Sequence, residues 1–192
     1  MISSFRATAL ICQALLFLIL STSAALAHEI RPAIAELSFG NDSSSYKLVI
    51  DVNLESLIAE IGPDHEDTDE STNADKYNLL RSMSPDDLGR EFQKFEKSFL
   101  GNLKLQTNDI KLGRQVTAVV IPEIGDTDLP RDSLVTVSGT LPNSAKSMNF
   151  GWDATFGSIV IRTAEEEGDD AYSAFLQNGD SSAEITIAGI TV

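Results

Sequence analysis

From residue 33 onward, apolar and polar residues alternate along short segments that turn-forming residues separate. The first two such segments are 33–39 and 46–52, and a turn rich in Gly, Asn, Asp and Ser joins them. Alternation with a period of two is typical of half-buried strands, so we predict a hairpin here. Further strands are predicted at 103–107, 115–121, 133–140, 147–152, 158–163, 172–177 and 183–190.

The region between the second and third of these strands follows a helical period instead. Apolar residues recur on one face of a helix over 54–61, and a short helix is expected over 77–83. Ser84 and Pro85 are typical of a helix N-cap and first turn, respectively. We therefore predict a longer helix from there to about Leu100.

About nine short strands at roughly ten-residue spacing predict a mainly β fold, an antiparallel β-sandwich. The helices form a two-to-three-helix insertion after the second strand. Residues 28–192 are expected to be a single exported β-rich domain, because no linker or repeat divides them. Within it, 61–76 is predicted to be an acidic mobile loop, since no apolar residue occurs between 64 and 73.

The first 27 residues, 1–27, have the three parts of a secretory signal peptide. Arg6 provides the positive charge, an apolar run covers 7–20, and Ala25-Leu26-Ala27 is the small-x-small pattern of a cleavage site. The apolar run is shorter than the roughly 18–20 residues of a membrane-spanning helix. We therefore predict cleavage after Ala27, a periplasmic location and a mature chain that begins at His28.

The net charge of the chain limits the classes of partner that it is expected to bind. The chain has 29 acidic and 14 basic residues, and its formal net charge is −15. Such a surface repels the phosphates of nucleic acids, so a nucleic-acid partner is not expected. No segment after the signal peptide approaches membrane-spanning length, so no direct membrane span is expected after cleavage.

Sequence patterns of common catalytic sites are missing. The chain contains no Gly-x-Ser-x-Gly, His-Glu-x-x-His or Walker pattern, and its single cysteine, Cys12, lies within the predicted signal peptide. Only two histidines occur. We therefore expect a protein that is not an enzyme, with an unrecognised hydrolase as an alternative.

His28 is the residue with the clearest chemical potential. After cleavage it carries a free α-amine beside its imidazole, and nitrogen ligands of this kind suit Cu(II) and Ni(II). His65 is the only other imidazole and is the candidate for a second ligand. Carboxylates in the predicted acidic loop attract hard cations, but their spacing is not that of an EF-hand, and we interpret them as a solvated charge run.

Several motifs resemble one known family. The stretch Ala27-His28-Glu29-Ile30-Arg31-Pro32-Ala33 is similar to the mature start of the extracytoplasmic region in HupE/UreJ-like membrane proteins. Further matches are Ile121-Pro122-Glu123-Ile124-Gly125-Asp126, Leu129-Pro130-Arg131-Asp132-Ser133, Gly151-Trp152-Asp153-Ala154-Thr155-Phe156-Gly157 and the segment 172–180.

The resemblance implies an exported β-rich region that acts with a bundle of membrane helices linked to nickel supply. That bundle does not follow Val192 in this sequence, so nickel transport is not carried over to it. The leading hypothesis is an accessory binding domain with an inner-membrane protein partner and a role in nickel or copper handling. The alternative is a periplasmic metallochaperone that uses His28.

The metallochaperone hypothesis predicts a metal affinity that depends on the position of cleavage. We expect protein that begins at His28 to bind Cu(II) or Ni(II) more tightly than protein with one extra residue before His28, because the chelate requires the free terminal amine. Calorimetric titration of both forms measures this difference. Equal affinity would contradict the hypothesis.

Overall fold

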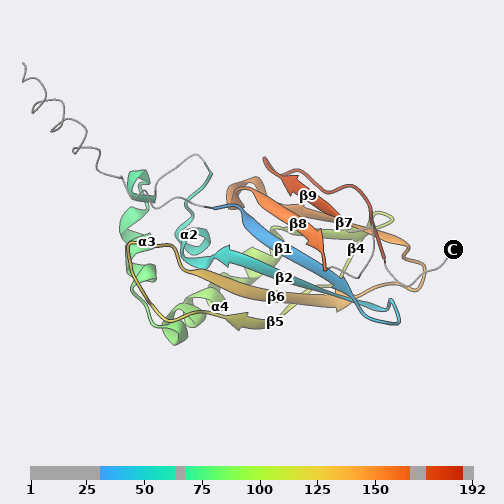
Figure 1. Cartoon of the computed structure of the whole chain (residues 1–192), viewed down its shortest axis with the longest axis horizontal. Coiled ribbons are helices and arrows are strands. Elements are labelled where there is room, and N and C mark those ends of the chain that lie inside the picture. The colour runs from blue at the N-terminus through green and yellow to red at the C-terminus, as the bar shows by residue number, and fades with distance from the viewer. Residues whose placement is uncertain (1–30, 64–67, 165–171, 188–192) are drawn as a thin grey trace, which may run out of the picture.

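The structure of the protein is a computed structural model that describes residues 31–63, 68–164 and 172–187. In these residues, ten strands form two sheets, and three α-helices are inserted after the second strand (Figure 1). The mainly β, sandwich-like class predicted from the alternation is therefore confirmed, and so is the position of the helical insertion.

The larger sheet contains six strands in the order β5-β6-β2-β1-β8-β9. The predicted hairpin forms its centre, because β1 and β2 pair antiparallel from Phe39↔Tyr46 to Ile34↔Asp51. The six strands, in chain order, are β1 (Ala33–Phe39), β2 (Ser45–Asn53), β5 (Gln115–Val120), β6 (Asp132–Thr140), β8 (Ile159–Thr163) and β9 (Ser173–Leu176).

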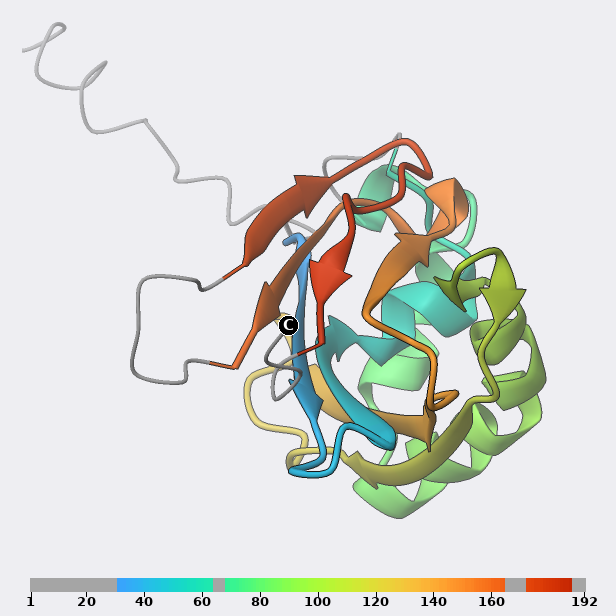
Figure 2. The same cartoon turned by 90° about the vertical axis from the view of Figure 1, so that its right-hand side faces the viewer.

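The smaller sheet contains four strands in the order β10-β7-β3-β4. These are β3 (Leu103–Thr107), β4 (Ile110–Lys111), β7 (Ser147–Trp152) and β10 (Ile185–Thr186). Seen from the end opposite the helices, the larger sheet curves around the smaller one (Figure 2). Strand β4 was not predicted, because it has only two residues. It follows the left-handed pair Asn108 and Asp109, which forms the tight turn of a hairpin.

One pairing differs from the expected antiparallel arrangement. Strand β8 pairs with β1 in parallel, from Ala33↔Ile159 to Leu37↔Thr163. The chain reaches β8 from β7 of the other sheet through the 3₁₀ helix η2 (Ala154–Phe156), so it enters the larger sheet in the direction of β1. A parallel pair needs such a crossover connection, which alternation along a single strand does not encode.

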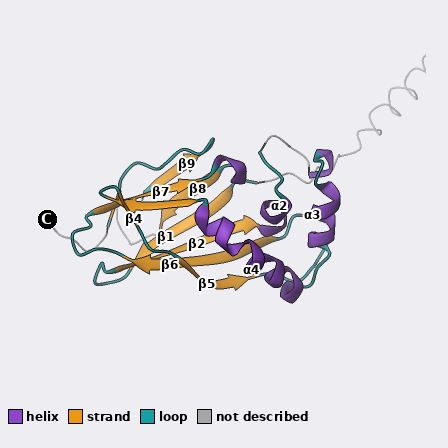
Figure 3. Ribbon diagram, turned by 180° about the vertical axis from the view of Figure 1, so that it is seen from behind, coloured by secondary structure: helices purple, strands orange, loops and turns teal. Residues whose placement is uncertain are grey.

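Helices α2 (Leu54–Ala59), α3 (Ala74–Arg81) and α4 (Pro85–Gly101) lie at one end of the sheets, and α4 runs back alongside them (Figure 3). The start of α4 follows from its sequence, because the Ser84 hydroxyl accepts a hydrogen bond from the Asp87 backbone N–H at 3.2 Å. Its apolar face buries Leu88, Phe92 and Phe99. This stripe packs α4 onto the common core.

The predicted loop 61–76 differs from the structure where it is described. A 3₁₀ helix, η1 (Thr68–Glu70), lies within it, and α3 begins at Ala74. The Thr68 side chain is buried, so this part of the segment packs against the rest of the fold. Residues 64–67 of the prediction lie outside the described residues.

The core is filled by alternate residues of both sheets and by the apolar faces of the helices. Its largest fully buried side chains are Trp152, Tyr46, Tyr77, Phe92, Phe99 and Phe150. Trp152 is therefore a core aromatic. Burial of this size supplies the main stabilising term of the fold.

The half-buried Gly139 on β6 lies where backbone and a core ring approach each other closely. A Cβ atom there would overlap the Gly113 carbonyl oxygen and lie 2.6 Å from the Tyr46 ring. The Tyr46 hydroxyl donates a hydrogen bond to the same Gly113 oxygen at 2.9 Å, and burial raises the pKa of Tyr46 to about 12. Backbone and ring are both fixed, so neither can move away from an added methyl group.

We therefore expect Gly139→Ala to lower the free energy of unfolding by about 1–3 kcal/mol, the usual cost of overpacking a core. Urea denaturation measures this change. Gly113→Ala is the matched control, because open space surrounds a Cβ at Gly113. A loss from Gly139→Ala no larger than that of the control would contradict the prediction.

Candidate functional site

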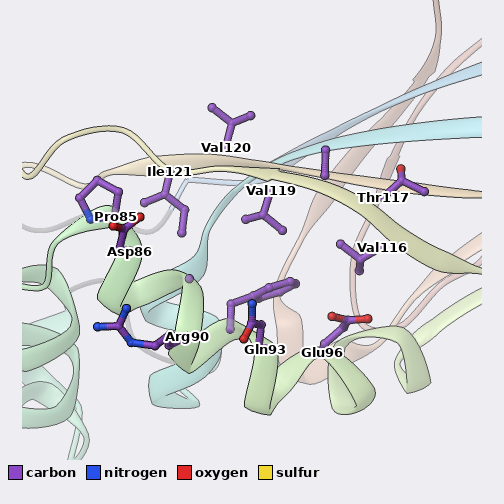
Figure 4. A pocket seen from close by; sticks show the side chains of 13 residues that line it. Pro85, Asp86, Arg90, Gln93, Glu96, Val116, Thr117, Val119, Val120 and Ile121 are labelled. Atoms are coloured by element: carbon purple, nitrogen blue, oxygen red, sulfur yellow. The ribbon is translucent and has the colours of Figure 1, made fainter.

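An open groove of about 740 Å³ lies between helix α4 and strand β5. Apolar side chains from both elements form its floor, and polar side chains of α4 form its rim (Figure 4). We call it the α4–β5 groove. It is lined by Pro85, Asp86, Gly89, Arg90, Phe92, Gln93, Glu96 and the segment 116–121.

Strand β5 gives one wall of the groove and is an edge of the larger sheet. Within the described residues it pairs with β6 on one side only, so its outer edge presents backbone N–H and C=O groups without a strand partner. A register shift between Val116 and Ala118 forms a β-bulge, which bends the strand. Edge strands of this kind are where another chain can pair.

Helix α4 gives the other wall. Asp86, Arg90 and Gln93 follow one another at spacings of three and four residues and therefore share one face of the helix. Figure 4 shows Val119 and Ile121 of the strand wall pointing toward this face. Arg90 also pairs with Asp87 on the helix surface. The groove thus combines an apolar floor with charges of both signs on its rim.

A buried arginine links the two walls at one end of the groove. The Arg131 guanidinium donates hydrogen bonds to the carbonyl oxygens of Met83, at 3.0 Å, and Pro122, at 3.4 Å. Met83 lies just before α4, and Pro122 lies just after β5. One side chain therefore joins the two walls where the helix begins and the strand ends.

A second arginine links the two walls at the opposite end of the groove. Arg114 lies just before β5, and its Nε donates to the Leu100 carbonyl oxygen in the last turn of α4 at 2.7 Å. That turn contains no basic residue of its own. The guanidinium therefore brings positive charge to the negative end of the helix dipole. Together, Arg131 and Arg114 hold α4 against β5 at both ends of the groove.

Arg131 is held in turn by a buried ion pair. Its Nε lies 2.8 Å from Oε1 of Glu55 on α2, and the two side chains are 2 % and 0 % exposed. Burial raises the pKa of the Glu55 carboxyl, while the charges of Arg131 and Arg81 act in the opposite direction. Arg81 extends this network to the carbonyl oxygens of Leu129 and Asp126 in the loop before β6.

The two predicted metal ligands, His28 and His65, both lie outside the described residues, so their positions stay predictions. Of the acidic run, Asp69 and Glu70 are described, and both are exposed on η1. In the described part of the chain, no group of three or more His, Cys, Asp or Glu side chains is arranged to hold a metal ion.

The groove and its two arginines were not predicted from the sequence. Arg131 lies in a stretch that resembles a family, but the resemblance assigns it no role. Arg114 belongs to no recognisable motif. The spacing of the α4 residues could have indicated a second, polar face. Nothing in the sequence pairs Glu55 with a cation 76 positions away.

The chain matches no protein-family model and no curated protein. No helix in its described part is both long and apolar enough to cross a membrane. The resemblance to HupE/UreJ-like proteins stays a prediction. Function is therefore inferred from the groove and the chemistry of its walls.

Removal of Arg131 tests whether the ion pair organises this region. We expect Arg131→Met to lower the free energy of unfolding by about 3–5 kcal/mol, because Glu55 is left buried and unpaired. Without the cation, the pKa of Glu55 rises further above its unfolded value. The associated stability is then present below the unfolded pKa and lost as pH rises, so the loss is larger near pH 7 than near pH 5.

Chemical denaturation at both pH values measures these effects. Arg162→Met is the matched control, because Arg162 pairs with Glu36 on the surface, where such pairs contribute about 0–1 kcal/mol. The double variant Glu55→Leu with Arg131→Met should regain most of the stability. A loss from Arg131→Met that is independent of pH would contradict the role of Glu55.

Proposed function

We propose that this protein is a non-enzymatic, exported accessory domain that binds an extended segment of a membrane-protein partner in the α4–β5 groove. The observation that carries the proposal is an edge strand without an outer partner in the described structure, lying beside an apolar groove. The arginine bonds at both ends keep the two walls apart and preformed. Preformed sites lose less conformational entropy on binding.

Strand addition is the binding mode that fits these walls. An incoming segment would pair its backbone with the outer edge of β5, and every second side chain would point into the groove. Strand β5 has six residues, which corresponds to about 20 Å at the usual rise per residue. The groove therefore suits a segment of roughly five or six residues.

The walls also define the chemistry of that segment. Side chains such as Phe92, Val119 and Ile121 favour apolar residues at alternate positions. On the rim, Asp86 and Glu96 outnumber Arg90, and the whole chain has a net charge of −15. A basic segment is attracted by this field, and an acidic one is repelled.

Export and the membrane partner rest on the sequence. The pattern of the first 27 residues supports delivery to the periplasm, and the resemblance to HupE/UreJ-like proteins supports an inner-membrane partner. A role in nickel or copper handling is part of the same hypothesis, which the titration of the His28 form tests independently of the groove.

Selection of extended peptides tests the groove directly. We expect a displayed random-peptide library to yield basic peptides with apolar residues at alternate positions. Val119→Arg should weaken their binding at least ten-fold, because Val119 points toward α4 and the longer side chain would occupy the groove. Isothermal titration calorimetry measures the affinities.

Two controls separate strand addition from other binding. Val160→Arg makes the same change at a half-buried valine of β8 that does not line the groove, and it should leave affinity unchanged. Methylation of single peptide backbone nitrogens should abolish binding at alternate positions only, because every second N–H points to β5. Binding that tolerates every methylation, or that survives Val119→Arg, would contradict the proposal.

A further inference from the structure

A second cavity, of about 560 Å³, opens on the opposite side of helix α4. Residues from α2, α4 and η2 line it, among them Leu57, Glu60, Phe95, Asn102, Phe156 and Asn178. No residue lines both this cavity and the α4–β5 groove. Its size lies in the usual range of sites for small molecules. We call it the Phe95 cavity.

Two aromatic rings form one wall of the Phe95 cavity. The centroids of the Phe95 and Phe156 rings are 6.0 Å apart, and the ring planes are inclined by 48°. Phe156 is fixed from behind by Trp152, 5.2 Å away, and by Phe99, 6.2 Å away. The wall is therefore rigid, and it offers aromatic surface to a ligand.

Local sequence explains why Phe156 is held there. The Asp153 carboxylate accepts hydrogen bonds from the backbone N–H and the hydroxyl of Thr155, at 3.0 and 2.8 Å. These bonds hold the pKa of Asp153 below its usual range and fix the first turn of η2. Gly157 ends η2 with a φ of 83°, which favours glycine.

Glu60 is the only charged residue among those that line the Phe95 cavity in the described structure. It ends α2 with a φ of 61°, in the left-handed region where glycine is unstrained and glutamate is not. Its side chain is exposed and makes no hydrogen bond or ion pair within the described structure, so such contacts do not offset the strain. Residues held in this way are concentrated at binding sites.

We infer that the Phe95 cavity binds a small organic cation, with its ammonium group against the Phe95 and Phe156 rings and balanced by the Glu60 carboxylate. Aromatic faces attract cations through their quadrupole, and the attraction is strongest for poorly hydrated groups such as quaternary ammonium. Glu60, the one charged residue of the cavity, is negative and therefore complements a cationic ligand. The net charge of −15 raises the local concentration of cations and lowers that of anions.

The chain provides its own reporter for this site. Trp152 is its only tryptophan and lies directly behind Phe156. We expect choline to change the Trp152 fluorescence saturably at millimolar concentration and constant ionic strength. The neutral isostere 3,3-dimethylbutan-1-ol should bind at least ten-fold more weakly, because it has the same shape without the charge. Equal binding of the two, or no saturable change with choline, would overturn the inference.

Two variants locate the site without threatening the fold. Glu60→Gly relieves the left-handed strain, so the midpoint of thermal unfolding should stay the same or rise while choline affinity falls at least five-fold. Phe95→Leu keeps an apolar side chain of the half-buried wall and should weaken choline binding to a similar extent.

Glu123→Gln is the matched control for charge. It removes one exposed carboxylate that does not line the Phe95 cavity and should leave choline affinity unchanged. Choline binding that falls equally in Glu123→Gln and Glu60→Gly would reflect the overall charge of the protein and overturn the inference. Peptide binding in the α4–β5 groove is measured separately, so either result can fail alone.

Discussion

The arrangement of the helices on the sheets depends on the burial of one cation, the guanidinium of Arg131. A buried charge must be paired and must have its hydrogen bonds satisfied, because its desolvation otherwise costs several kcal/mol. Arg131 meets this requirement only by reaching Glu55 on α2, Leu80 on α3, and the chain at either end of the groove, at Met83 and Pro122. The relative placement of these segments is thus a consequence of satisfying the hydrogen bonds and the charge of one buried side chain.

This constraint explains why an edge strand can remain open beside a helix. An unsupported apolar groove would close by moving α4 onto β5, since that burial is favourable. The bonds of Arg131 at one end and of Arg114 at the other fix the separation of the two walls. The bulge in β5 adds curvature, which discourages indiscriminate pairing with flat strands. The groove can therefore be selective for segments that match both its edge and its floor.

Much of the fold was predictable because local patterns determine it. Alternation located the hairpin of β1 and β2, and Ser84 with Pro85 located the start of α4, since both are properties of neighbouring residues. The parallel pairing of β8 with β1 was not predictable, because it depends on the path of the chain between sheets. The burial of Glu55 was not predictable either, because it depends on the ion pair with Arg131, which lies 76 positions away in the chain. Long-range charge pairing leaves no periodic signal.

Helix α4 contributes three different faces to the core, the groove and the second cavity, and this division follows from its sequence. Leu88, Phe92 and Phe99 form the buried stripe, Arg90 and Gln93 face the groove, and Phe95 with Ser98 faces the second cavity. At 100° per residue, the last two faces lie on opposite sides of the helix. Because α4 is held at both ends and buried along its length, a ligand on one face can be accommodated without moving the other wall. Ligand binding at the groove and at the cavity should therefore be independent of each other. The reason is that α4 is held in place at both of its ends.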